Sequence, residues 1–271
     1  MKKILVPIDF SETSLNAAYS ACKIAQKNQS VLIFVHAYRV PIESFKIKRI
    51  VLNDKVFEQE LDARKYFKNF VLDNLKLKGK IPIMKFDIEH GFAIDVILNK
   101  TKHYQVEMVV MGTKGASKLL DRMWGSVTSN VIKSAKVPVL AIPNNAEYRD
   151  FKKIVYATDF DAKDEIVLKK IEAFRDMFNA NVSVLHVGQN DNEKEIHRKK
   201  GMLDSLGESN IVHSLLLYEV DQESVVEGIE SFIENNDLDL LVMLTHDNYW
   251  FHKSVTKRIA LKTEIPILVY H

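Results

Sequence analysis

The chain has 271 residues, with 38 lysines and arginines against 36 aspartates and glutamates, so its net charge is +2. Hydrophobic residues make up 46% of it, an ordinary composition for one large globular domain or two of average size. The near-zero charge argues against a nucleic-acid binder, and no apolar run reaches the roughly 18 residues of a membrane-spanning helix. Cys22 is the only cysteine, so we expect no intrachain disulfide and a cytoplasmic location.

The sequence contains an internal repeat. Residues 2–10 resemble residues 152–160, and each of these runs ends in Asp-Phe. Three later anchors keep the same order in both halves: His36 with His186, 126–128 with 254–256, and 137–140 with 265–268. We therefore predict two domains of one fold, residues 1–146 and 147–271.

Short apolar runs alternate with helical patterns in the first half. The runs are rich in Val and Ile, which is typical of buried parallel strands. They predict five strands, at 3–8, 31–36, 81–88, 106–111 and 137–142. Between the first two strands, one helix face carries Leu15, Ala18, Cys22 and Ala25, with Ser11 as the expected N-cap. On this face Cys22 is interpreted as a small buried apolar residue rather than a reactive thiol.

The second half repeats this alternation. One face of its first predicted helix carries Val167, Ile171, Phe174 and Phe178, and Asp161 is the expected N-cap. Strands that alternate with helices predict an α/β fold, in which a parallel sheet lies between helices in each domain.

Three of the nine glycines lie close together, at Gly112, Gly115 and Gly125. They fall between the fourth predicted strand and the next helix, at the sheet edge where open α/β sheets bind ligands. The unpaired N–H groups of a helix start suit a phosphate, a glycine lets it approach, and Ser126 and Thr128 add hydroxyl groups. The alternative is that the glycines only shape a tight loop and Ser126 only caps the helix.

These residues resemble the universal stress protein family, whose nucleotide-binding pattern is Gly-x2-Gly-x9-Gly-Ser/Thr. The chain matches it completely with Gly112-x2-Gly115-x9-Gly125-Ser126, and residues 4–14 and 126–140 resemble the flanking family signatures. The resemblance covers both halves and implies a tandem protein of this family. It implies two five-stranded parallel sheets of order 3-2-1-4-5, flanked by helices, in the adenine nucleotide alpha hydrolase-like fold.

The resemblance also implies a ligand, ATP, with or without Mg²⁺. Adenine is then held near the ends of the first two strands, where Ala37 reads its edge through the backbone, and Asp9 lies near the ribose or a phosphate-bound metal. The implied site comprises Pro7, Ile8, Asp9, Ala37, Met111, Gly112, Gly115, Gly125, Ser126, Val127 and Thr128. For Asp9 a second role stays open, since an aspartate that closes a strand commonly caps the next turn.

The second half departs from the glycine pattern. Leu244, Asp247 and Lys253 stand where the first half has its three glycines. We expect the leucine to fill the hollow and the aspartate to repel phosphate, so that only the N-terminal domain binds ATP. The second domain is then expected to act as a structural partner, paired with the first through their last strands, and a homodimer of chains stays open.

Several histidines are candidates for metal ligands or catalytic bases. His246, Asp247, His252 and His271 do not have the spacing of a reliable metal site, so we predict no metal ligands. His36 and His186 end equivalent strands, and we interpret both as structural because no nucleophile is tied to either.

These observations predict an ATP-binding regulatory protein of the stress response. The alternatives are an enzyme that slowly hydrolyses ATP or transfers a phosphoryl group at the same loop, and an interaction protein that binds no nucleotide. No catalytic residue is predicted, because no dedicated base or pair of metal-binding aspartates is evident. We expect neither nucleic acid nor a membrane as a partner.

Overall fold

The computed structural model describes residues 2–39, 52–75, 77–113, 126–160, 163–188, 193–206, 215–245 and 264–271. These residues form two compact units, one that ends at Asn144 and one that runs from Asn145 to His271. The division lies close to the predicted one, which placed the boundary after residue 146. No helix in the described ranges combines the length and the apolar character that crossing a membrane requires.

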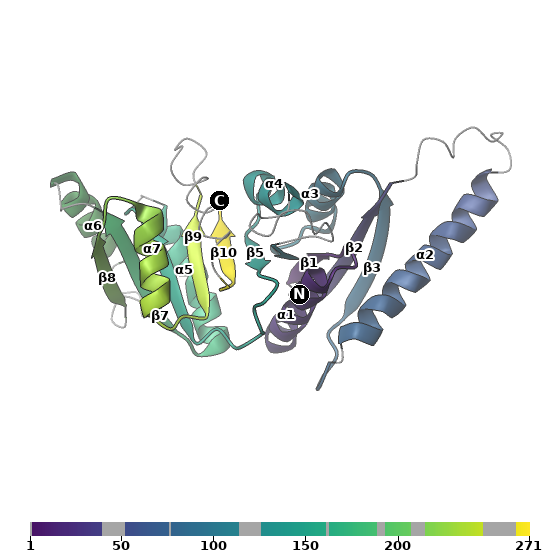
Figure 1. Cartoon of the computed structure of the whole chain (residues 1–271), viewed down its shortest axis with the longest axis horizontal. Coiled ribbons are helices and arrows are strands. Elements are labelled where there is room, and N and C mark those ends of the chain that lie inside the picture. Colours follow the sequence, from purple (N-terminus) through teal and green to yellow (C-terminus); the bar gives the residue numbers. More distant parts are fainter. Residues whose placement is uncertain are drawn as a thin grey trace. The chain divides into compact units, whose positions relative to one another are not determined.

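The first unit alternates strands and helices along the chain (Figure 1). Its elements are β1 (Lys3–Pro7), α1 (Glu12–Asn28), β2 (Val31–Tyr38), α2 (Leu52–Leu75), β3 (Met84–His90), α3 (Ala93–Tyr104), β4 (Met108–Gly112), α4 (Ser126–Ser134) and β5 (Val139–Ile142). The strands are parallel and lie in the order β3-β2-β1-β4-β5, which is the predicted order. Helices α1 and α2 cover one face of this sheet, and α3 and α4 cover the other.

The second unit repeats this plan. Its elements are β6 (Lys153–Thr158), α5 (Asp164–Phe178), β7 (Asn181–Gly188), α6 (Glu193–Leu206), β8 (Leu216–Asp221), α7 (Val225–Asn235), β9 (Leu240–Leu244) and β10 (Ile267–Tyr270). The strands are again parallel, in the order β8-β7-β6-β9-β10, so each unit has the same topology. The predicted α/β fold, with five parallel strands of this order in each unit, is therefore confirmed.

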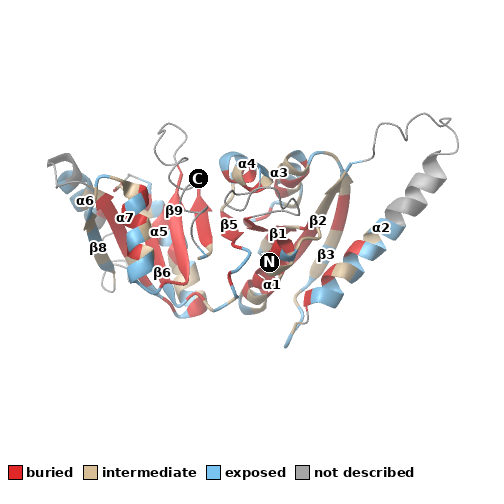
Figure 2. Cartoon of the chain, viewed as in Figure 1, coloured by how far each residue is buried: buried red, intermediate tan, exposed pale blue. Residues whose placement is uncertain are grey.

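The core of each unit lies on its central strands and on the helix faces against them (Figure 2). All residues of β4, β5, β9 and β10 are buried, as expected for strands covered on both faces. Cys22 is fully buried on α1, and this burial raises the pKa of its thiol to about 12. The interpretation of Cys22 as a packing residue is confirmed, because the thiolate is the reactive form.

The two helices that follow the first strand of each unit begin differently. Ser11 caps α1 as predicted, since its hydroxyl oxygen accepts a hydrogen bond from the Ser14 amide at 3.1 Å. The predicted cap of α5 was wrong: Lys163 holds the N-cap position and makes no side-chain cap, while Asp161 lies outside the described residues.

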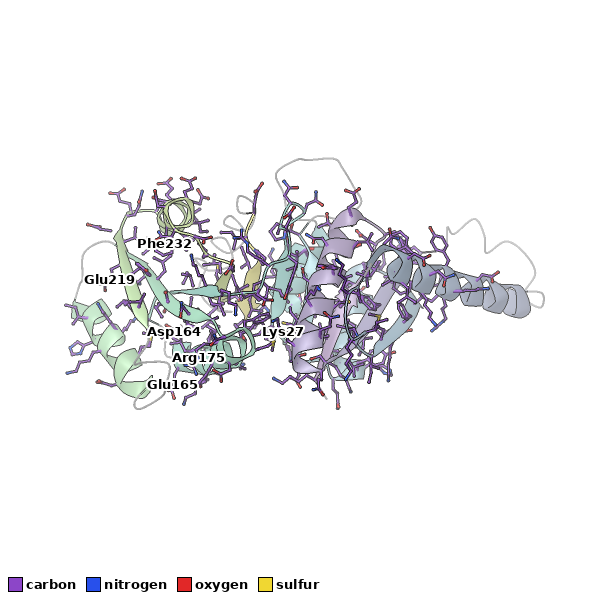
Figure 3. The ribbon with its side chains drawn as sticks, turned by 90° about the horizontal axis from the view of Figure 1, so that it is seen from below. Lys27, Asp164, Glu165, Arg175, Glu219 and Phe232 are labelled. Atoms are coloured by element: carbon purple, nitrogen blue, oxygen red, sulfur yellow. The ribbon has the colours of Figure 1, made fainter. Side chains whose placement is uncertain are left out.

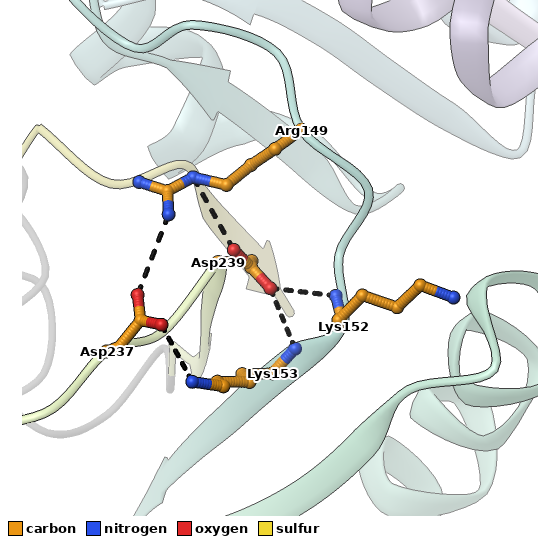
Figure 4. Close-up of polar contacts among 5 residues, drawn as sticks. All are labelled: Arg149, Lys152, Lys153, Asp237 and Asp239. Atoms are coloured by element: carbon orange, nitrogen blue, oxygen red, sulfur yellow. Dashed lines mark hydrogen bonds and ion pairs between the residues drawn. The ribbon is translucent and has the colours of Figure 1, made fainter.

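A cluster of charges joins the amino ends of two strands in the second unit (Figure 4). Asp239, which is 7% exposed, accepts hydrogen bonds from the backbone amides of Lys152 and Lys153 at 2.8 and 2.9 Å. Arg149 lies 3.5 Å from the same carboxylate, and Asp237 pairs with the Lys153 amine at 2.7 Å. Asp239 thus ties the start of β9 to the start of β6, at the sheet edge opposite to the predicted ligand edge.

Candidate functional site

The turn after β1 is built by Asp9. One carboxylate oxygen of Asp9 accepts hydrogen bonds from the amide and the hydroxyl of Ser11, at 3.1 and 2.6 Å. This geometry is the turn-capping role considered for Asp9, and it fixes the approach to α1. The role of Asp9 near a ribose or a metal ion stays a prediction.

Phe10 follows with a left-handed backbone, at a φ of 63°, which is uncommon for a residue other than glycine. Its ring packs on His36 at 4.5 Å between centroids, and Nδ1 of His36 lies 2.8 Å from the carbonyl oxygen of Ile8. The second unit repeats the arrangement with Phe160, whose φ is 58°, and His186. In each unit the Nδ1 atom of the histidine thus lies at hydrogen-bond distance from a backbone carbonyl, which agrees with the structural role predicted for both residues.

The sequence analysis missed the phenylalanines, although a signal for them was present. In both halves an Asp-Phe pair follows the first strand and a histidine ends the second strand, with the same separation between them. A repeated pair at a repeated distance indicates a contact that both units keep.

Among the described residues, the backbone of Ala37 has no strand partner on its β1 side. The β1–β2 ladder ends with the pair Pro7 and Val35, and the carbonyl of Val35 accepts from the Ile8 amide at 2.8 Å. Backbone groups of alternate residues in a strand point to the same side. The N–H and C=O of Ala37 therefore point toward the β1 side, beyond the end of that ladder.

Gly112 ends β4 in close contact with the start of α1. A Cβ at this position would lie 2.5 Å from the Thr13 Cγ2 atom and 2.9 Å from the Thr13 carbonyl oxygen. The carbonyl of Gly112 accepts a hydrogen bond from the Thr128 hydroxyl at 2.8 Å. Gly112 thus has a packing role. The Thr128 hydroxyl, which was expected to face a phosphate, donates its hydrogen bond to the protein backbone instead.

The other predicted residues fall into three groups. Ile8 and Met111 are buried, and their backbones already have protein partners: Val35 and His36 for Ile8, and β5 for Met111. Ser126 and Val127 form the first turn of α4, where backbone amides lack partners within the helix. Gly115 and Gly125 lie outside the described residues.

The second unit contains a cavity of about 260 Å³ at the carboxyl edge of its sheet. It is lined by the equivalents of Pro7, Ile8, Asp9, Ala37, Met111 and Gly112, which are Ala157, Thr158, Asp159, Val187, Met243 and Leu244. The repeat thus brings together the positions that the sequence predicted as one site. The expectation that Leu244 fills this hollow was wrong, because Leu244 forms part of its wall; Asp247 and Lys253 lie outside the described residues.

The acidic, cysteine and histidine side chains do not form a metal site in the part of the chain that the structure describes. Within the ranges that the structure describes, no group of three His, Cys, Asp or Glu side chains is arranged to hold a metal ion. The His271 ring nitrogen Nδ1 lies 3.0 Å from the Thr245 hydroxyl. His246, Asp247 and His252 lie outside these ranges.

Each unit has parallel strands in the order 3-2-1-4-5 between helices, which is the adenine nucleotide alpha hydrolase-like fold. A profile of the Universal stress protein family matches residues 1–143 and, a second time, residues 150–271. The chain therefore belongs to the universal stress protein family and carries two copies of its domain.

Individual relatives agree with this assignment. The chain is 32% identical over 156 residues to universal stress protein MJ0577 of Methanocaldococcus jannaschii, which covers 52% of this chain and 94% of the relative. It is 28% identical over 144 residues to universal stress protein YxiE of Bacillus subtilis, covering 52% and 97%.

A solved structure covers the chain as a whole. A universal stress protein from Archaeoglobus fulgidus superimposes with a TM-score of 0.75 over 99% of this chain and 97% of that chain. The sequence identity is 16%, so this similarity concerns the fold alone.

Proposed function

We propose that the N-terminal unit binds ATP and that the protein acts as a nucleotide-dependent regulator in the stress response. The observation that carries this proposal is the cavity of the second unit. Its walls are the repeats of six residues predicted for the nucleotide site, which supports the same grouping of their counterparts in the first unit. Only the first unit has the complete glycine pattern in its sequence.

The chemistry of the first unit suits the three parts of ATP. The backbone of Ala37 offers a donor and an acceptor to the adenine edge. The first turn of α4 offers backbone amides and the positive end of a helix dipole to the phosphates. Asp9 carries the only carboxylate of the proposed set, and such oxygen ligands suit the Mg²⁺ that accompanies nucleotide phosphates.

Calorimetric titration of the full chain with ATP and Mg²⁺ tests this proposal. We expect one site per chain. Gly115→Asp places in the first unit the residue that the second unit has at the equivalent position. It should weaken ATP binding by about tenfold or more, because a carboxylate there opposes the phosphates.

Gly115→Ala is the matched control, since it adds a side chain without a charge and should weaken ATP binding less than the aspartate does. Gly112 is unsuitable for this test, because a side chain there would also disturb the packing on Thr13. Two equivalent sites per chain, or unchanged affinity in Gly115→Asp, would contradict the proposal.

A further inference from the structure

The cavity of the second unit differs in its polar groups from the equivalent place in the first unit. Asp164, labelled in Figure 3 at the start of α5, is buried and accepts hydrogen bonds from the hydroxyls of Tyr156, at 2.6 Å, and Thr158. The first unit has Ser14 at the position of Asp164 and an apolar residue at the positions of the two hydroxyls. The second unit has thus acquired a buried carboxylate next to its ligand edge.

His186 lines the same cavity and is only 7% exposed. Its Nδ1 atom lies 3.0 Å from the Thr158 carbonyl oxygen, which can only accept, so Nδ1 carries the ring proton. Its Nε2 atom is buried and has no hydrogen-bond partner among the described residues. Nε2 therefore presents a lone pair, and a buried acceptor without a partner is costly to leave unpaired.

Residue 188 is a glycine, so no Cβ lies against this nitrogen. A Cβ on Gly188 would lie 2.8 Å from Nε2, and Gly188 also lines the cavity. In the first unit the equivalent residue is Tyr38, which carries a large side chain. The second unit therefore has no side chain at residue 188 beside the Nε2 atom of its histidine.

The carboxylates that line the cavity disfavour an anion. Among the described residues of the lining, Asp159 and Asp164 are acidic, and Arg198 is basic but exposed on α6 and screened by solvent. The remaining wall is largely apolar, and a volume of about 260 Å³ lies just below the range of about 300–1,000 Å³ that is usual for drug-sized ligands. A triphosphate suits neither the charge nor the size.

We propose that the C-terminal unit binds a small uncharged molecule, of the size and chemistry of a nucleoside without phosphates, which donates an N–H or O–H hydrogen bond to Nε2 of His186. This second site is distinct from the proposed ATP site in the first unit and does not depend on it. The protein then carries two sites, one for a triphosphate and one for an uncharged molecule.

Adenosine is the probe, because it is uncharged and carries both N–H and O–H donors. The full chain is labelled with ¹⁵N in its histidine rings, His186→Phe assigns the His186 signals, and adenosine, AMP and ATP are titrated. We expect a saturable shift of the His186 Nε2 signal with adenosine, weaker binding of AMP at this signal, and ATP at least about tenfold weaker than adenosine. Failure of adenosine to shift this signal, or an equal response to ATP, would overturn the proposal.

Two variants close the cavity from different walls. Gly188→Ala adds a methyl group against Nε2, and Val225→Phe narrows the cavity without altering the histidine. Each should weaken the adenosine response by about tenfold, while Gly201→Ala, where an added Cβ meets nothing within 4 Å, should leave it unchanged. Unchanged affinity in either cavity variant that keeps the other histidine signals in place would count against the site. ATP binding by the first unit is measured separately by calorimetry, so the two proposals fail independently.

Discussion

The two units share a topology but differ where the first helix meets the fourth strand. In the first unit Gly112 lets Thr13 approach β4, and α1 begins at Glu12. In the second unit the buried Leu244 replaces that glycine, and α5 begins at Asp164, the equivalent of position 14. Glycine at position 112 thus permits a close contact between β4 and the start of α1, because a side chain there would meet the Thr13 backbone.

We expect the largest difference in stability between the units at the amino ends of their strands. Asp239→Ala removes the acceptor of two backbone amides in the second unit, and each hydrogen bond to a charged group is worth about 1.5–3 kcal/mol. We expect the second unit to lose about 3 kcal/mol in its free energy of unfolding. Hydrogen exchange in β6 and β9 under increasing urea measures this loss.

Glu107→Ala is the matched substitution in the first unit. Glu107 lies at the equivalent position, but its carboxylate is exposed and pairs with the Lys2 amine at 4.0 Å. Such a surface pair contributes about 0–1 kcal/mol, so this variant should keep nearly its full stability. Equal losses of unfolding free energy in the two variants would show that burial of the Asp239 carboxylate does not determine how much it stabilises the unit.

A smaller change in stability is expected when Gly112, which the second unit lacks, is replaced. Gly112→Ala places a Cβ against the Thr13 backbone and should destabilise the first unit by about 2 kcal/mol, as overpacking does. Gly201→Ala is the control, since it lies within α6 with open space around it and should stabilise the second unit by about 0.5–1 kcal/mol. Urea unfolding of both variants measures the two changes; a neutral Gly112→Ala would remove the packing role of this glycine.

The sequence predicts the repeat, the strand order and the residues that gather at the ligand edge, because these follow from local periodicity and from the family resemblance. It also predicts the Ser11 cap, which depends on residues three positions apart. It does not predict the role of Leu244 in the cavity wall, because the space around a side chain depends on elements far apart in the chain. The sequence does not predict the unpartnered nitrogen of His186 for the same reason, because burial and hydrogen bonding at Nε2 are properties of the packed unit.

The smallest expected effect concerns acid stability, where the first unit has a buried ion cluster on β3 and α3. Asp87 lies 2.6 Å from the Lys100 amine and accepts from the Tyr104 hydroxyl at 2.8 Å. Burial alone would raise the pKa of Asp87, but these hydrogen bonds and the charges of Lys100 and Arg64 outweigh it and lower the pKa. A lowered pKa stabilises the fold above the ordinary aspartate pKa of about 3.9, and this contribution is lost as the pH falls through the folded-state value. Asp87→Asn keeps an acceptor for the Tyr104 hydroxyl and leaves Lys100 paired with Glu89, so it should cost about 1 kcal/mol at neutral pH and should flatten the loss of first-unit stability in acid. Hydrogen exchange in β3 between neutral and acidic pH tests this, and an acid profile identical to that of the unsubstituted protein would exclude Asp87 as the responsible group.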